Sequence, residues 1–256
     1  MNKYWIWFSR INKIGAKAQN KLLEKYHNPE EIWNLTKKEL QGILDDKQIE
    51  IILNQKNRIN LEKYAEYMQK HEIKMITIFD EKYPQNLRNI YDPPVVLYIR
   101  GNENIINEFS IAIIGSRVCS NYGKQVAKQF AYNLSKYNIN IVSGLAKGID
   151  TYAHVGTIQA KKTTIAVIGS GLDIIYPEEN KKLYEEIIKN NGAIISEYIV
   201  GTKPEKLNFP ERNRIISGLS KGILVVEANK KSGTFITVDF ALEQGKNIYA
   251  IPRQHK

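Results

Sequence analysis

The feature that most constrains the fold of this chain is a regular alternation of short apolar runs and helix-like segments from residue 109 onward. Strands are expected at the apolar runs 111–114, 139–142, 164–168, 193–195, 223–226 and 248–251. Helices are expected between them, at 121–137, 149–160, 179–190, 212–220 and 233–244. Near-continuous apolar strands separated by helices are typical of a parallel sheet covered on both faces. The sequence therefore predicts an α/β fold, a Rossmann-like doubly wound and mainly parallel sheet.

A helical pattern precedes this region. Over residues 3–70 apolar side chains recur at helical spacing, and Pro29 and Thr36 occupy positions typical of helix starts. Two short strands are expected in the connecting stretch 75–105, which is interrupted by prolines. We therefore expect a small helical N-terminal domain over 1–74. The Rossmann-like domain is expected over 75–256, with 75–105 as its entry segment.

The charge balance favours an anionic partner. The chain of 256 residues has a formal net charge of +10, and the excess is larger after residue 105, where 20 Lys and Arg face 13 Asp and Glu. A composition rich in Lys, Asn and Ile could also produce this excess without any binding role. A single cysteine, Cys119, excludes a disulfide framework and a Cys-based zinc site. We expect no signal peptide, no membrane span and a cytoplasmic location.

Glycine-containing turns follow four of the expected strands. In a doubly wound sheet, ligands bind beyond the carboxyl ends of the strands, where glycine lets the backbone approach a ligand closely. Arg117 adds a planar fork suited to phosphate. Such glycines also occur simply because tight strand-to-helix turns need them, so packing remains an alternative explanation. The candidate binding residues in these turns are Gly115, Ser116, Arg117, Ser143, Gly144, Lys147, Gly169, Gly171, Ser232, Gly233 and Thr234.

The run 208–214, Asn-Phe-Pro-Glu-Arg-Asn-Arg, places an aromatic ring and two guanidiniums in a segment that is not plainly strand or helix. A Phe ring offers a face on which a base can stack, and Arg offers charge to a phosphate. Phe209, Arg212, Asn213 and Arg214 are therefore further candidates for a nucleic-acid site.

Known catalytic patterns are missing from the sequence. The chain contains no G-x-G-x-x-G fingerprint, P-loop, G-x-S-x-G elbow or H-E-x-x-H motif. His154 lies four residues after Asp150, and we expect Asp150 to cap the helix and His154 to pack beneath it. Glu197 and Glu227 could act in a hydrolase, although such residues more often cap helices or pair with Arg. Cys119 is expected to be a bystander thiol.

Taken together, these segments resemble the DNA-processing protein A family, also called DprA or Smf, over residues 75–252. The order and spacing of the motifs carry the resemblance: I-I-G-S-R at 113–117, V-S-G-L-A-K-G-I-D at 142–150, G-S-G-L-D at 169–173 with Y-P at 176–177, S-E at 196–197, F-P-E-R-N-R-I-I at 209–216, S-G-T at 232–234 and I-P at 251–252.

The resemblance implies a function and roles for single residues. It implies a homodimer without a cofactor that binds single-stranded DNA and loads the RecA recombinase onto it during natural transformation. Arg117 and Lys206 resemble the family's phosphate-contacting pair and Phe209 its base-stacking platform. Arg212, Asn213 and Arg214 resemble the rest of the pocket wall, with the alternative that one of the two arginines holds the loop through a carboxylate.

The two ends of the chain depart from the family pattern. Residues 11–15 resemble a helix-hairpin-helix, but Lys13 replaces its first glycine, so we expect a packing or interaction role for the N-terminal domain. The family usually continues past the last strand, whereas this chain stops four residues after Pro252. Either the sequence is shortened or it is a naturally truncated member.

Two other functions remain as alternatives. Gly115-Ser116-Arg117 and a Gly-Thr turn also resemble lysine-decarboxylase-like phosphoribohydrolases, which hydrolyse nucleotides. That family expects P-G-G-x-G-T with a catalytic Glu, where this chain has A-N-K-K-S-G-T at 228–234. The third possibility is a protein-interaction scaffold without a nucleic-acid role.

Overall fold

The structure is a computed structural model, and it describes residues 3–56, 59–229 and 232–252. Three features of the sequence analysis lie outside the described residues: positions 230–231 of the alternative hydrolase motif, the chain end 253–256, and the side chain of Lys13.

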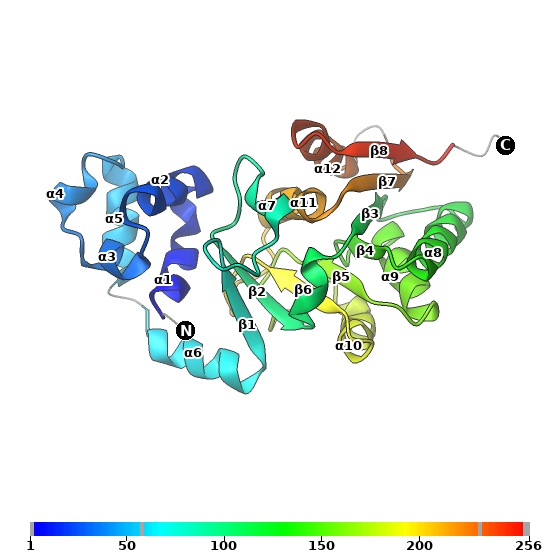
Figure 1. Ribbon diagram of the computed structural model, residues 1–256, viewed down its shortest axis with the longest axis horizontal. Helices are drawn as coiled ribbons and strands as arrows, with labels where there is room; N and C mark the ends of the chain where they lie inside the picture. The colour runs from blue at the N-terminus through cyan, green and yellow to red at the C-terminus, as the bar shows by residue number, and fades with distance from the viewer. Residues whose placement is uncertain (1–2, 57–58, 230–231, 253–256) are drawn as a thin grey trace.

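A single mixed sheet forms the centre of the molecule (Figure 1), in the order β1-β2-β6-β5-β4-β3-β7-β8. In this order, all strands from β6 through β5, β4, β3 and β7 to β8 are parallel, whereas β2 runs antiparallel to both β1 and β6. The prediction of a Rossmann-like, mainly parallel α/β fold is confirmed. The strands are β1 (Ile73–Thr77), β2 (Val96–Gly101), β3 (Ser110–Gly115), β4 (Asn140–Ser143), β5 (Thr164–Val167), β6 (Ala193–Ser196), β7 (Gly222–Glu227) and β8 (Asn247–Ala250).

Helices cover both faces of the sheet because neighbouring residues of each central strand point to opposite faces. In β3, Ile113 packs in a hydrophobic cluster with residues of α8 and α9, while Ala112 and Ile114 pack in a second cluster with residues of α11 and α12. The helices of this region are α7 (Gln85–Arg88), η2 (Glu103–Asn107), α8 (Asn121–Lys136), α9 (Ile149–Gln159), η3 (Glu178–Asn180), α10 (Lys181–Lys189), α11 (Asn208–Leu219) and α12 (Thr234–Glu243).

The strand order reverses at β3, which pairs with β4 on one side and β7 on the other. Ligands in doubly wound sheets bind near such a switch point. The turn that begins at Gly115 leaves the sheet there, and the backbone N–H of Ser116 donates to the carbonyl of Glu227 at 2.6 Å. The fold thus places Arg117 at the position where this class of sheet usually binds its ligand.

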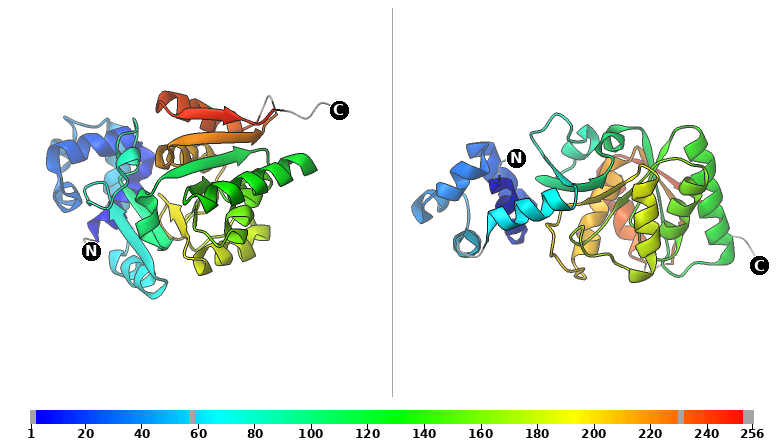
Figure 2. Two further views of the ribbon diagram at one scale, coloured as in Figure 1. Left: turned by 45° about the vertical axis from the view of Figure 1, so that its right-hand side comes forward. Right: turned by 90° about the horizontal axis from the view of Figure 1, so that it is seen from below.

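The N-terminal helices pack beside the β1–β2 edge of the sheet (Figure 2). Asn28 caps the helix that begins at Pro29, and Thr36 forms a capping box with Glu39, so both predicted helix starts are confirmed. These helices are α1 (Tyr4–Arg10), η1 (Ile11–Ile14), α2 (Ala16–Tyr26), α3 (Pro29–Asn34), α4 (Lys37–Leu40), α5 (Asp46–Lys56) and α6 (Leu61–Lys70). No helix among the described residues is both long and apolar enough to span a bilayer.

The helix predicted at 212–220 begins earlier, at Asn208. The run 208–214 is therefore not an irregular loop but the first two turns of α11. Pro210 is compatible with this start because a first-turn residue has no intrahelical partner for its N–H. The early start places Phe209 at the end of the helix that faces the sheet's turns.

Candidate nucleic-acid interface

The ring of Phe209 is in contact with an arginine and with a second aromatic side chain. The central guanidinium carbon of Arg117 is 5.5 Å from the centroid of the Phe209 ring. The ring of Tyr176 lies 5.5 Å away between centroids, with the planes tilted by 39°. Arg117 and Tyr176 are exposed and Phe209 is half-buried, so the three residues form a partly open surface of π faces and positive charge. We call them the Phe209 cluster.

The close approach of α11 to the end of β5 positions this cluster. Asn208 donates through Nδ2 to the carbonyl oxygen of Gly169 at 3.1 Å and to that of Lys203 at 3.3 Å. A Cβ at Gly169 would lie 3.2 Å from the Phe209 ring, closer than most side-chain contacts allow. Gly169 therefore lets Phe209 sit directly against the turn after β5.

Arg212 ties the same helix to the ends of two strands. Its guanidinium is buried, and its Nη1 donates to the carbonyl oxygen of Gly144 at 2.7 Å and to that of Val167. Burial lowers the pKa of Arg212 to about 10, partly offset by the nearby Asp150 carboxylate, so the side chain stays charged at neutral pH. Arg212 is thus held by backbone acceptors at the carboxyl ends of β4 and β5.

Asp150 does not act as the helix cap expected from its position. Its carboxylate accepts the backbone N–H groups of Gly144 at 3.0 Å and Ala146 at 3.4 Å, both in the loop before α9. The cap position of α9 is Gly148, without a side-chain hydrogen bond. Asp150 is buried beside Arg212; burial raises the pKa of its carboxyl, and the nearby guanidinium offsets part of that rise.

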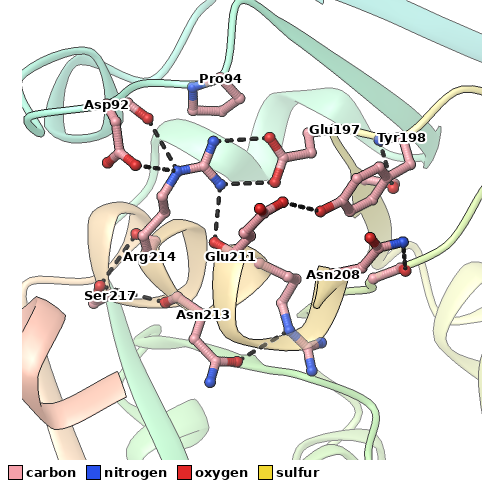
Figure 3. Close-up of polar contacts among 12 residues, drawn as sticks. Asp92, Pro94, Glu197, Tyr198, Asn208, Glu211, Asn213, Arg214 and Ser217 are labelled. Carbon is pink, nitrogen blue, oxygen red and sulfur yellow. Dashed lines mark hydrogen bonds and ion pairs between the residues drawn. The ribbon is translucent and has the colours of Figure 1, made fainter. Parts of the chain in front are cut away.

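Arg214 is engaged by two carboxylates (Figure 3). It forms a bidentate pair with Glu197, at 2.7 and 2.8 Å, and its Nε lies 3.0 Å from both the backbone oxygen and the carboxylate of Asp92. Its side chain is only 5% exposed. Burial opposes the charge, but Glu197 and Asp92 outweigh it and raise the pKa of the guanidinium. The expectation that Glu197 pairs with a neighbouring arginine is confirmed.

Protein atoms already fill the space beside three of the candidate glycines. A Cβ at Gly115 would lie 2.8 Å from the carbonyl oxygen of Glu227, one at Gly144 2.7 Å from Arg212, and one at Gly171 2.6 Å from the oxygen of Ile199. In contrast, nothing lies within 4 Å of a Cβ at Gly233. The first three glycines therefore allow close packing of the turns.

The candidate hydroxyls also have protein partners. Ser116 donates to the carbonyl of Val118 at 2.6 Å and accepts its N–H, which holds the turn carrying Arg117. Ser143 is buried and donates to the oxygen of Ile113 at 2.7 Å. The hydroxyls of Ser232 and Thr234 bond to each other at 2.7 Å. Asn213 accepts from Nε of Arg212 at 3.2 Å.

The remaining basic side chains near the start of α11 are exposed. Lys206 lies in the turn before the helix, and Lys203 lies three residues earlier. Within the described ranges, neither they nor Arg117 take part in an ion pair, whereas Lys147 pairs with Glu179 on the surface. The charges of Arg117, Lys203 and Lys206 are thus available to an anion.

Sequence reasoning did not select Tyr176 or Lys203 as site residues. A groove of about 630 Å³ lies next to Tyr176 and Pro204, with Lys147 and Lys181 among its lining residues. The signal available in the sequence was the Tyr-Pro pair after the glycine turn at 169–171. Its relevance depended on knowing that Phe209 packs against Tyr176.

The titratable groups considered as catalytic candidates are buried, bonded to other protein groups or shifted in pKa. His154 is buried and bonds to the hydroxyl of Thr164 at 2.8 Å, and burial, together with Arg212, lowers its pKa to about 3. Burial and the nearby Glu227 raise the pKa of the Cys119 thiol. Glu227 accepts hydrogen bonds from Ser120, the cap of α8. No cluster of metal-binding side chains occurs among the residues that the structure describes.

Comparison with known proteins identifies the family of the chain. Residues 74–256 match the family model of DNA recombination-mediator protein A. The chain belongs to this family. The resemblance seen in the sequence motifs is thereby confirmed.

Several relatives are similar over most of this chain. The identity is 38% to Protein Smf of Synechocystis sp., 46% to DNA processing protein DprA of Streptococcus pneumoniae and 39% to that of Bacillus subtilis, over 97%, 69% and 95% of this chain. The chain spans 64%, 62% and 82% of the lengths of these three proteins.

Two solved structures extend the similarity to three dimensions. The structure of DprA from S. pneumoniae matches 99% of this chain and 88% of its own, with a TM-score of 0.85 and 35% identity. A structure of DprA from Helicobacter pylori, described for its single-stranded DNA binding mode, matches 72% of this chain and 82% of its own, with a TM-score of 0.65 and 32% identity.

Proposed function

We propose that this protein binds single-stranded DNA without reading its sequence, with the Phe209 cluster and Lys206 as the principal contacts. The observation that carries the proposal is the partly exposed Phe209 ring in contact with Arg117 and Tyr176, beyond the carboxyl ends of parallel strands. Every base has a π face, so stacking on Phe209 is independent of sequence, and Arg117 and Lys206 supply charge to the phosphates.

The buried candidates have a positioning role in this proposal. Arg212 and Arg214 are each 4% exposed and bonded to protein acceptors, which favours a role in holding the first turns of α11. The glycines and hydroxyls of the turns at 115–116, 143–144 and 169–171 hold the turns that Phe209 and Arg117 depend on. Lys203 joins Lys206 as a second candidate for phosphate contact.

A role in recombination follows from the family. The family whose model matches residues 74–256 is described as DNA recombination-mediator protein A. We propose that the protein acts in the cytoplasm as a homodimer, without a cofactor or enzymatic activity, and that it helps to load the RecA recombinase onto the bound strand. The support for dimerisation and for RecA is the family resemblance alone.

Binding of fluorescently labelled oligo(dT) over a series of salt concentrations tests the DNA-binding part. We expect tight binding whose log K falls linearly with log salt, by about 0.7 per phosphate contacted. A nucleoside monophosphate is incubated with the protein in parallel. Release of free base, without salt-dependent binding of oligo(dT), would support the phosphoribohydrolase alternative instead.

A further inference from the structure

A second basic and aromatic groove lies between the helical domain and the sheet. Its volume is about 700 Å³. One wall is a face of α2, which presents Lys17, Lys21 and Glu24 at helical spacing, with the buried Leu23 also in the lining. Leu22 of the same helix is fully buried and does not line the groove. The residues of the opposite wall follow β1 or lie between α7 and β2: Ile78, Phe79, Tyr91 and Pro93.

The aromatic side chains of this groove are unusually open. Tyr91 is 82% exposed and Phe79 is 52% exposed. The ammonium of Lys17 lies 5.9 Å from the centroid of the Tyr91 ring. Phe79 is held from the protein side by Trp5 in an edge contact at 5.8 Å and by a stacked His27 at 6.1 Å. Both rings therefore offer free surface to a ligand beside a positive charge.

The charge of the groove favours a polyanion. Lys17 and Lys21 are exposed, and in the described part of the chain neither forms an ion pair, while Glu24 is the one carboxylate of the lining. Exposed aromatic rings next to lysines are the combination that binds single-stranded nucleic acid, with bases on the rings and phosphates on the ammonium groups. An acidic peptide would use the lysines but has no planar bases to stack on Tyr91.

The loop that carries Tyr91 is bonded to the helix that carries Phe209. Tyr91 directly precedes Asp92, which Arg214 of α11 holds through both its backbone and its carboxylate. Phe209 lies five residues before Arg214 on the same helix, which corresponds to about 7.5 Å along the helix axis. The bonds between Arg214 and Asp92 therefore fix the position of the Tyr91 loop relative to the helix that carries Phe209.

We propose that this groove, formed by α2 with Phe79 and Tyr91, is a second binding site for the same single strand of DNA. The inference rests on the proposed function, because it adds a further contact to a strand already held at Phe209. It predicts that long strands gain affinity from the groove and that short strands, which occupy only the Phe209 cluster, do not.

The test compares oligo(dT) of about 6 and about 30 nucleotides, the first near the lower end of a typical site size of about 4–16 nucleotides and the second well above it. The variant combines Lys17→Gln, Lys21→Gln and Tyr91→Ala, all at exposed positions. Two matched controls are Lys25→Gln, an exposed lysine of the same helix outside the groove lining, and Tyr137→Ala, an 81% exposed tyrosine at the end of α8.

For the triple variant we expect roughly tenfold weaker binding of the long strand and unchanged binding of the short one. Its salt slope on the long strand should fall by about 1.4, the value for two phosphate contacts. Lys21→Glu alone should also weaken binding of the long strand. Both controls should bind both lengths like the parent.

Two results would overturn the proposal, and they are distinguishable. If the folded triple variant and Lys21→Glu bind both lengths like the parent, no strand uses the groove, and an acidic peptide becomes the better candidate for its occupant. If the parent binds neither length, the proposed function itself is wrong and the second site is rejected with it.

Discussion

At the scale of single residues, the arginines near the sheet's carboxyl edge are of two kinds. Arg117 is exposed and lies over the ring of Phe209, while Arg212 and Arg214 are each 4% exposed and bonded to fixed acceptors. A buried guanidinium with satisfied donors cannot turn to a phosphate without leaving a carboxylate or carbonyl unpaired, which is costly. The exposed fraction therefore distinguishes the arginine that can contact DNA, Arg117, from the two that hold the fold in place.

The exposed residues should contribute to DNA binding in measurably different ways. Arg117→Ala and Lys206→Ala should each weaken binding of oligo(dT) and reduce the salt slope by about 0.7, because each removes one phosphate contact. Phe209→Ala should cost about 1–3 kcal/mol with little change in slope, since stacking releases few counterions. Lys182→Ala, at an exposed position of α10, is the control. Parent-like binding by all three folded variants would place the site elsewhere.

His154 should make the protein sensitive to mild acid. Burial lowers its pKa from 6.5 to about 3, so the unfolded chain binds a proton that the folded chain excludes. Stability is then fully present above pH 6.5 and is lost as the pH falls toward 3, by about 2 kcal/mol between pH 6.5 and 5. The pKa of Asp150 is raised by burial, so the contribution of this carboxyl to stability increases as the pH falls, opposite to that of His154.

Urea unfolding at several pH values checks the contribution of His154. His154→Gln should be less stable at pH 7, because it disturbs the bond to Thr164, but its stability should depend less on pH between 6.5 and 5. The carboxylates are the same in both proteins, so the difference between their stability–pH profiles reports on the histidine alone. Parallel profiles would show that folding does not lower the pKa of His154.

At the scale of elements, the strands could be predicted and the start of α11 could not. Runs such as 111–114 and 193–195 are apolar throughout because helices cover both of their faces. The run 208–214 lacks an apolar period, because Arg212 and Arg214 are buried there by partners distant in sequence. The carboxylate of Glu197 is 17 residues from Arg214, and the backbone oxygen of Asp92 is 122 residues away. No local pattern contains those partners.

The pair of Arg214 and Glu197 should stabilise the docking of α11. Arg214→Met leaves Glu197 and Asp92 partly buried without a counter-charge and should cost roughly 3–5 kcal/mol of unfolding free energy. Adding Glu197→Gln should restore part of the loss, since the uncompensated charge is removed. Urea unfolding of the parent, both single variants and the double variant measures this coupling. Strictly additive losses would show that the two side chains do not act as a pair.

At the scale of the whole molecule, the helical region and the sheet share one apolar interior. A single cluster of buried side chains contains Trp7 and Leu22 of the helical region together with Val96 and Ile194 of the sheet. The hydroxyls of Ser9 and Tyr98 bond across the junction at 2.6 Å. The change from a helical to an alternating pattern in the sequence predicted two kinds of structure. It carried no information on the contact between them, because packing across a junction has no local signature.

The shared interior predicts that both regions unfold together. All three tryptophans, Trp5, Trp7 and Trp33, lie in the helical region, so their fluorescence reports on that region alone. Far-UV circular dichroism reports on the whole chain, most of which is the sheet region. In urea the two signals should give one midpoint, because loss of the helices would expose the apolar residues of β2 and β6.

Tyr98→Phe, which removes the bond to Ser9, should lower both midpoints equally, by about 1 kcal/mol in stability. A fluorescence transition that precedes the dichroism transition would show that the helical region opens independently. Such opening would also disrupt the groove between α2 and Tyr91 while the Phe209 cluster stayed intact.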